Sequence, residues 1–531
     1  MKKLSERVLS VFLSLVIVLT AVIVYNPAAC ADEAKGTDIP LVYVVGQGNG
    51  LCVTENGKKR EIYPLDIPTD DLMQAAKDNL DVFAKAVFTQ EWEEFGDVLH
   101  DIIAPLFEEL KLDENGEAPN GSRADWSYSV SKLKNKKPVN GKYSTRTFTF
   151  NYDWRLDPNK VADQLHQYIK DICQVTGYEK IALTGRCLGA CIVAAYMNKY
   201  DGEYVQDLIL HCSALNGATI CSKAFSGDLY FDADSIERFM YDMELDADLE
   251  MDNVMNELLK SFVTLFNKTY GLDLTCWAIN NVWEDIYHDV MPKTLIETMG
   301  TWPGFWSMVG DEDYIRAKEN VFYGQDMEKW SNFIDIIDDY HYNVQVKAAD
   351  NLRGYAERGI DVYNITKYGY QTVPISAPAN VLSDSYCTVF DASMGATTTT
   401  LDSCFDTAYI SNAQQNGTLK YISPDKQIDA STCLFPERTW FIKNVPHKEF
   451  PEDIDRLLDA LVNNEDMTVD TVKEFPQYLV FEDDVMSPQT YENMDTTTVK
   501  YKHSFFDALR TFFENLFAII RDYFAKNKTT E

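Results

Sequence analysis

Gly185-Arg186-Cys187-Leu188-Gly189 joins a short apolar segment to a longer helix-forming one. Residues 180–184 before it predict a short buried strand, and residues 190–200 after it predict a helix. Glycines two positions on either side of Cys187 allow a sharp turn in which a larger side chain would clash. We therefore expect a strand, a tight turn and a helix whose N-terminal N–H groups point toward Cys187.

This pentapeptide has the form of a nucleophile elbow, with a thiol where a serine hydroxyl normally stands. A thiolate is a better nucleophile than a neutral serine. A neighbouring histidine, the helix N-terminus and the charge of Arg186 would each favour the thiolate. Attack of Cys187 on an ester would form an acyl-thioester.

The segments on both sides of this unit alternate between strand and helix patterns. Strands are expected at residues 41–45, 146–152, 205–211, 360–366 and 439–443, and helices at about 158–173 and 452–462. Such alternation predicts a mostly parallel sheet covered by helices on both faces, which is an α/β architecture. We assign residues 38–221 and 359–463 to the two parts of this core.

A helical cap is expected between the two parts, at residues 222–358, because this insertion is rich in helix formers, aromatic residues and acids. Its aromatic side chains have two compatible interpretations, as the core of the cap or as the lining of an apolar substrate pocket. They include four tryptophans, Trp277, Trp283, Trp302 and Trp306.

The two ends of the chain predict export and a separate helix. Basic residues precede an apolar run at 8–24 and an Ala29-Cys30-Ala31 site, so residues 1–31 are expected to be a signal peptide of a secreted or extracytoplasmic protein. A retained membrane anchor or a lipid-modified Cys30 is the alternative. Residues 464–503 predict an acidic linker and residues 504–526 an amphipathic helix, whose apolar face would dock on the core, pair with another copy or lie at a membrane surface.

Composition restricts the partners of this 531-residue chain. With 83 acidic and 48 basic residues the formal net charge is −35, which disfavours binding to nucleic acid. The eleven cysteines follow no metal-ligand or disulfide-scaffold spacing. Dinucleotide-binding, P-loop and H-E-x-x-H motifs do not stand out, so no cofactor and no metal site is predicted.

Several motifs together resemble the lecithin:cholesterol acyltransferase-like branch of the α/β-hydrolase lipases. They are residues 40–50, Tyr152-Asp153-Trp154-Arg155, the Cys187 turn, Thr301-Trp302-Pro303-Gly304-Phe305-Trp306 and a late Asp-x-x-Ile followed by histidine. The resemblance covers residues 40 to about 461, and departs from the family at Arg186, Cys187 and Ala190. It implies an α/β-hydrolase fold with a cap, and a lipase-like, esterase or acyltransferase activity in lipid metabolism on an ester or lipid substrate.

The fold's chain order of nucleophile, acid and histidine requires a base downstream of Cys187. The downstream histidines are His288, His341, His447 and His503. His288 and His341 fall in the insertion and His503 in the tail. His447 follows an expected strand and precedes an expected helix, and we therefore predict it as the catalytic base.

For the acid, the resemblance matches Asp425 to the first position of the family's Asp-x-x-Val/Ile pattern. Asp429 is interpreted as a turn or cap residue, and Asp361, at a strand end, is an alternative acid. The predicted triad is thus Cys187, Asp425 and His447.

Two backbone amides are expected to form an oxyanion hole. One belongs to Leu188, directly after the nucleophile, and the resemblance places the other at Gln47, directly after Gly46. The glycines around Gln47 also fit a second interpretation, in which they only permit a tight turn.

The expected function is hydrolysis of a carboxylic ester, with transfer to an alcohol ranked second because exported enzymes meet abundant water. A protein of another class remains as the alternative: a catalytically inactive member of the same fold that binds an apolar ligand or a protein partner. Cys187 is small and partly apolar, so it fits an inactive turn as well as an active one.

Overall fold

The computed structural model describes residues 36–47, 50–65, 74–75, 78–242, 253–490, 506–512 and 514–515 of the chain. Its largest element is an eight-stranded sheet with the order β13-β12-β11-β8-β7-β6-β1-β5. All neighbouring strands are parallel except β12 and β13, which are antiparallel. The predicted α/β class with a mostly parallel sheet is confirmed.

Six strands of the sheet coincide with expected ones to within a few residues. They are β1 (Leu41–Val44), β5 (Phe148–Phe150), β6 (Ile181–Arg186), β7 (Val205–His211), β8 (Asp361–Tyr368) and β11 (Thr439–Lys443). The other two, β12 (Tyr478–Glu482) and β13 (Val485–Pro488), lie inside the predicted acidic linker 464–503. The linker prediction was wrong there because the apolar run that begins at Tyr478 is short and is surrounded by acidic residues. The first three residues of this run are buried.

Helices cover both faces of the sheet, as predicted. Alternate side chains of β1 point to opposite faces. Val42 and Val44 join a core that contains α6 (Pro158–Thr176), α7 (Leu188–Tyr200) and α17 (Ala348–Glu357), whereas Leu41 and Tyr43 pack with α20 (Glu452–Asn463). Helix α17 contacts β8 although its residues fall within the predicted insertion, so the last part of that insertion belongs to the sheet layer.

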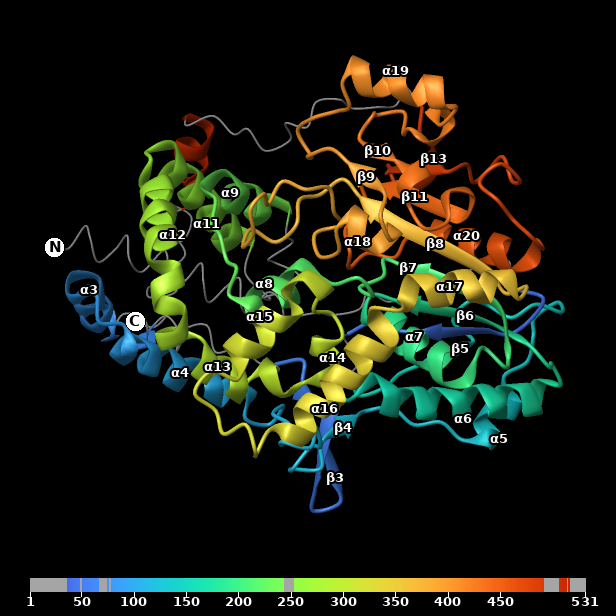
Figure 1. The fold of residues 1–531 in the computed structure, drawn as a ribbon, viewed down its shortest axis with the longest axis horizontal. Helices are drawn as coiled ribbons and strands as arrows, with labels where there is room; N and C mark the ends of the chain where they lie inside the picture. The colour runs from blue at the N-terminus through green and yellow to red at the C-terminus, as the bar shows by residue number, and fades with distance from the viewer. Residues whose placement is uncertain are drawn as a thin grey trace, which may run out of the picture.

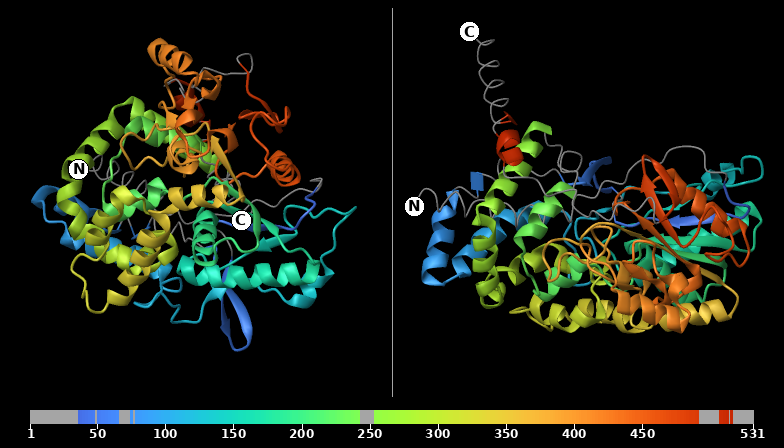
Figure 2. Two further views of the ribbon diagram at one scale, coloured as in Figure 1. Left: turned by 45° about the vertical axis from the view of Figure 1, so that its right-hand side comes forward. Right: turned by 90° about the horizontal axis from the view of Figure 1, so that it is seen from above.

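Most of the predicted insertion is helical. Its elements are α9 (Ala233–Asp242), α11 (Asn253–Lys268), α12 (Gly271–Val290), α13 (Pro292–Glu297), η1 (Met299–Thr301), α14 (Pro303–Trp306), α15 (Asp311–Val321), α16 (Ser331–Tyr340) and η2 (His341–Gln345), after α8 (Thr219–Ser226). Helices α3 (Leu80–Thr89) and α4 (Glu93–Phe107) lie beside α12 and α13, on the side of the molecule away from the sheet (Figures 1 and 2).

The four tryptophans of this region divide between buried and exposed positions. Trp283, Trp302 and Trp306 are buried, which agrees with their interpretation as core residues, whereas Trp277 is 64% exposed.

Shorter elements complete the described chain. They are β2 (Leu51–Glu55), β3 (Lys58–Tyr63) and β4 (Arg123–Ala124), which form an antiparallel sheet, the pair β9 (Thr397–Thr398) and β10 (Ile428–Asp429), helices α5 (Val130–Asn135), α18 (Val389–Ser393) and α19 (Thr407–Asn416), and the 3-10 turns η3 (Leu419–Tyr421), η4 (Ala430–Thr432) and η5 (Pro436–Arg438).

Two of the motifs noted in the sequence pack against each other. Arg155 forms a buried ion pair with Asp153 at 2.6 Å and donates to the carbonyl of Leu110 at 2.9 Å. The N–H of Gly304 donates to the carbonyl of Arg155 at 3.0 Å, and the indole of Trp302 donates to the same Leu110 carbonyl at 2.8 Å. A Cβ at Gly304 would lie 2.0 Å from the carbonyl oxygen of Trp154, so the close approach of the two motifs requires glycine.

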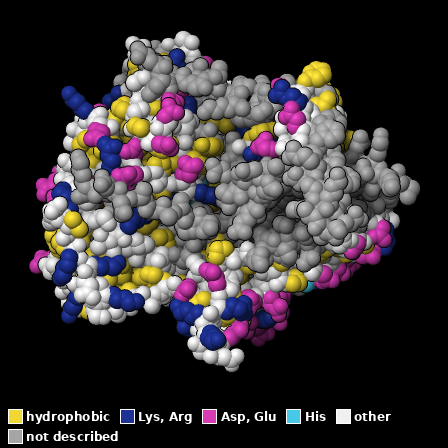
Figure 3. Space-filling view, turned by 180° about the vertical axis from the view of Figure 1, so that it is seen from behind, with side chains coloured by type: hydrophobic (Ala, Val, Ile, Leu, Met, Phe, Trp, Pro, Cys, Tyr) yellow, Lys and Arg dark blue, Asp and Glu magenta, His cyan; other side chains and the backbone are white. Residues whose placement is uncertain are grey.

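The predicted signal peptide, with Cys30, lies outside the described residues, and so does most of the predicted amphipathic helix. The described part of that helix, residues 506–512 and 514–515, is helical, and Phe506 is 77% exposed. Among the described residues, no helix combines the length and the hydropathy needed to cross a membrane. Acidic side chains line the lower right edge of the face shown in Figure 3, in keeping with the negative net charge.

Candidate active site

Cys187 occupies a sharp turn between β6 and α7, as the glycine pattern predicts. Its backbone has φ 53° and ψ −124°, a conformation that is strained for a residue with a side chain. A Cβ at Gly189 would lie 2.5 Å from the carbonyl oxygens of Val44 and Val45. A Cβ at Gly185 would lie 2.7 Å from the carbonyl oxygen of Gly189. Both glycines are therefore needed for the close packing of β1, β6 and α7 that holds the turn.

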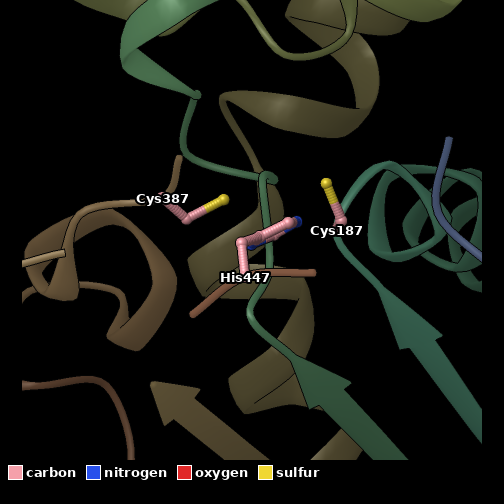
Figure 4. Close-up of side chains that lie close together, drawn as sticks. All are labelled: Cys187, Cys387 and His447. Carbon is pink, nitrogen blue, oxygen red and sulfur yellow. The ribbon is translucent and has the colours of Figure 1, made fainter. Parts of the chain in front are cut away.

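The structure brings His447 to Cys187. His447 lies on the loop that follows β11 and precedes α20. Its imidazole and the Sγ of Cys187 lie within 4.8 Å of each other (Figure 4). Nδ1 of His447 is 2.7 Å from Oδ2 of Asp384, and the main-chain N–H of His447 donates to the Asp384 carbonyl at 2.7 Å. Because the carboxylate holds Nδ1, Nε2 is the ring nitrogen left to exchange a proton with the thiol.

Asp384, which the sequence analysis did not select, takes the place predicted for Asp425. Asp425 instead accepts hydrogen bonds from Lys443 at 2.9 Å, Tyr368 at 3.0 Å and Gln489 at 3.1 Å, in a separate buried cluster. The expectation that Asp425 meets His447 was wrong, because a four-residue pattern cannot show which loop reaches a histidine.

The two other aspartates weighed in the sequence also have partners elsewhere. Asp429 caps η4 by accepting from the N–H of Ser431 at 2.9 Å, which confirms its interpretation as a cap residue. Asp361 pairs with Arg438 at 2.6 Å. The one sequence signal that could have pointed to Asp384 is its place on the long segment after β8, the strand next to β11 in the sheet.

The other downstream histidines are held away from Cys187 where they are described. His288 bonds to Asn320 at 2.8 Å, and His341 bonds to Gln345 at 2.7 Å and to Asp311 at 3.1 Å. His503 lies outside the described residues.

A second thiol, which the sequence analysis did not single out, belongs to the same cluster. Sγ of Cys387 lies within 4.8 Å of both Cys187 Sγ and the His447 ring, and Figure 4 shows the two thiols on opposite sides of the imidazole. Cys387 and His447 are buried, whereas Cys187 is partly exposed. The cluster is thus accessible mainly at Cys187.

The electrostatics favour a thiolate at Cys187. A hydrogen bond from Cys387, the positive charge of His447 and the N–H of Leu188 hold the Cys187 pKa well below its usual range. The same hydrogen bond raises the pKa of Cys387, which therefore stays protonated. Burial alone would lower the pKa of His447, but Asp384 and the Cys187 thiolate raise it above its ordinary value. Both shifts favour the thiolate form of Cys187 and the protonated form of His447.

Two buried cations fix the loop that carries His447. Nζ of Lys367, on β8, donates to the carbonyls of Pro446 at 2.7 Å, His447 at 2.9 Å and Glu449 at 2.9 Å. The guanidinium of Arg186 also donates to the His447 carbonyl. Hydrogen bonds from side chains of β6 and β8 to its main-chain carbonyls thus hold the loop in position.

The predicted oxyanion-hole residues lie next to Cys187. Leu188 is the first residue of α7, and its N–H interacts with the Cys187 sulfur. A Cβ at Gly46 would lie 3.1 Å from Cys187 Cβ, so the segment that carries Gln47 passes directly beside the thiol. The amide Nε2 of Gln47 is buried and has no hydrogen-bond partner among the described residues. A role of both amides in stabilising an oxyanion stays a prediction.

No family model matches this chain, and no curated protein matches its sequence. The resemblance to the lecithin:cholesterol acyltransferase-like lipases therefore rests on the motifs themselves. What the arrangement can do chemically has to be argued from the thiol, the imidazole and the carboxylate.

Proposed function

We propose that the chain is a thiol-dependent acyl hydrolase with an α/β-hydrolase fold, acting on a carboxylic ester through Cys187, His447 and Asp384. The observation that carries the proposal is the aligned array of thiol, imidazole and carboxylate at the carboxyl ends of parallel strands. Ligands of open parallel sheets bind outside these strand ends, which is where a nucleophile meets its substrate.

The first half-reaction transfers the acyl group to the enzyme. The Cys187 thiolate attacks the ester carbonyl carbon and forms a C–S bond while the carbonyl oxygen becomes an oxyanion. The N–H of Leu188, together with that of Gln47, stabilises this oxyanion. The C–O bond then breaks, the leaving alkoxide takes the Nε2 proton of His447, and the alcohol departs from an acyl-thioester.

The second half-reaction restores the thiol. Neutral His447 removes a proton from water, the resulting hydroxide attacks the thioester carbon, and the C–S bond breaks to give the carboxylic acid and the Cys187 thiolate. An alcohol in place of water would give a new ester, so hydrolase and acyltransferase differ here only in the acceptor. Asp384 holds the imidazole in the required tautomer and stabilises its protonated form.

Export and a lipid substrate belong to the same proposal. The basic and apolar start of the sequence supports a secreted or extracytoplasmic enzyme, and the free thiol at Cys187 then favours a reducing or anaerobic surrounding. The aromatic-rich helices between β7 and β8 support a cap that selects apolar acyl chains. For the C-terminal amphipathic helix, the proposal is that it contacts a membrane surface or another copy of the chain.

The test is intact-mass spectrometry of the reduced protein after incubation with p-nitrophenyl esters of short and long acyl chains. We expect an acyl adduct and ester turnover in the wild type, both lost in Cys187→Ala, and turnover lost in His447→Ala by about 10⁴-fold or more. A folded wild type with neither adduct nor turnover for any chain length would favour the catalytically inactive binding protein instead. Turnover that appeared only in Cys187→Ser would favour it further.

A further inference from the structure

Cys187, Cys387 and His447 have the composition and the spacing of a metal site. One ligand atom from each of them lies within 4.8 Å of the other two. Two thiolates and an imidazole are the donors that select Zn²⁺ over the oxygen-preferring Mg²⁺ and Ca²⁺. Zn²⁺ bound by three protein ligands keeps its fourth position for water or substrate.

The ligands are held in place by one shared carboxylate. Oδ2 of Asp384 fixes Nδ1 of His447 at 2.7 Å, and Oδ1 accepts the main-chain N–H of Cys387 at 2.9 Å. A carboxylate behind the histidine is the usual outer-shell partner of a zinc ligand, since it turns the other ring nitrogen toward the metal. Asp384 therefore orients two of the three donors before any metal arrives.

Both cysteines are free thiols, and the cluster is compact enough for its three side chains to bind one metal ion. Tetrahedral zinc with Zn–S bonds of about 2.3 Å holds two sulfurs about 3.8 Å apart, whereas a disulfide requires about 2.05 Å. The three ligand atoms lie within 4.8 Å of one another, a range that includes a sulfur–sulfur separation of about 3.8 Å, and Figure 4 shows the three side chains close together. Cys387 and His447 are buried, so a metal would enter at the partly exposed Cys187.

We propose that Cys187, Cys387 and His447 form a Zn²⁺ site that switches off the thiol while the metal is bound. Binding uses the Cys187 thiolate, and releases the Nε2 proton of His447 and the thiol proton of Cys387. The bound thiolate and imidazole are no longer available as nucleophile and base. Metal binding stands on geometry alone, and only the competition with ester turnover rests on the proposed function.

The test titrates the reduced full chain with Zn²⁺ against a chromophoric chelator, and with Co²⁺ as a spectroscopic substitute. We expect one metal per chain, a thiolate-to-Co²⁺ charge-transfer band and the visible bands of tetrahedral Co²⁺, with no comparable binding of Mg²⁺. Cys387→Ser should weaken Zn²⁺ binding at least about 100-fold and reduce the charge-transfer band. His447→Ala should weaken binding similarly and retain the band.

Controls come from cysteines outside the cluster, the exposed Cys404 and the buried Cys433. Cys404→Ser and Cys433→Ala should bind Zn²⁺ as the wild type does, and circular dichroism of every variant checks that it is folded. Zn²⁺ binding unchanged in folded Cys387→Ser, or Co²⁺ bound without a thiolate band, would overturn the proposal.

Activity then separates this site from the proposed function. If the wild type hydrolyses esters, Zn²⁺ should inhibit it and a chelator should restore it. Zn²⁺ binding by a wild type without turnover would refute the hydrolase and leave the metal site standing. Turnover without stoichiometric Zn²⁺ binding would refute the metal site and leave the hydrolase standing.

Discussion

The turn at Cys187 and the loop that carries Asp384 both hold a reactive side chain, but they are held in different ways. The turn is fixed by local close packing, in which Gly185 and Gly189 allow the backbones of β1, β6 and α7 to touch. The Asp384 loop is fixed by bonds to a distant segment, above all those to His447, 63 residues further along the chain. A change in the turn should therefore act through steric strain, and a change near the loop through lost hydrogen bonds.

The largest effect is expected when the carboxylate of the loop is neutralised. Asp384→Asn should lower kcat by about 10²- to 10⁴-fold, because the amide no longer stabilises the His447 imidazolium or selects its tautomer. Asp425→Asn is the matched variant. It should change kcat by less than about 3-fold and lower the free energy of unfolding by about 3–5 kcal/mol, because Lys443, whose side chain is only 13% exposed, loses its charge partner.

Steady-state kinetics and urea unfolding of both variants decide between the two aspartates. A large loss of kcat in Asp425→Asn with little change in Asp384→Asn would restore the acid predicted from the sequence.

A smaller effect is expected when the His447 loop loses its buried cation. Lys367→Met removes three hydrogen bonds to main-chain carbonyls, so His447 should move relative to Cys187 and kcat should fall by about 10- to 100-fold. Lys180→Met, which removes an exposed lysine bonded to the Glu203 carbonyl, is the control and should leave kcat unchanged. Equal kinetics for the two variants would show that the loop keeps its place without Lys367.

The reactivity of the thiol tests how far the distant loop controls the turn. Alkylation of Cys187 by iodoacetamide should rise with pH around a midpoint well below the pKa of an ordinary thiol. Removing the positive charge in His447→Ala raises the Cys187 pKa, so less thiolate is present at neutral pH and alkylation at pH 7 should slow by about 10-fold. Peptide mass spectrometry in a Cys404→Ser background separates this site from the exposed thiol. An unchanged midpoint would mean that the acidity of the thiol is set without His447, by the hydrogen bond from Cys387 and by the turn.

The smallest effect is expected for steric strain at the turn itself. Gly189→Ala places a Cβ against two carbonyl oxygens of β1 and the residue after it, and should lower the free energy of unfolding by about 1–3 kcal/mol. Gly354→Ala, in helix α17 where the nearest atom to the new Cβ is 3.5 Å away, should instead stabilise by up to about 1 kcal/mol. Urea unfolding of both variants measures the difference. An unchanged free energy of unfolding in Gly189→Ala would show that β1 and α7 can separate slightly.

The parts predicted well are those whose signal lies within about twenty residues. Six strands of the large sheet, the turn at Cys187 and the loop position of His447 follow from apolar periodicity and glycine spacing; the strands are β1, β5, β6, β7, β8 and β11. The aspartate that contacts His447 was missed because Asp384 lies in an irregular segment without periodicity, and the contact depends only on where that segment folds back. Strand β12 was missed because its short apolar run is surrounded by acids.

The sequence by itself determined the alternation of strands and helices and the turn that presents Cys187, because both depend on interactions between near neighbours in the chain. Only the tertiary structure decided which carboxylate meets His447 and which second thiol joins Cys187. Asp384 and Cys387 are about 200 residues from Cys187 in the sequence. Their distances are set by the order of β6, β7, β8 and β11 in the sheet and by the buried cations that hold the loops at its carboxyl edge.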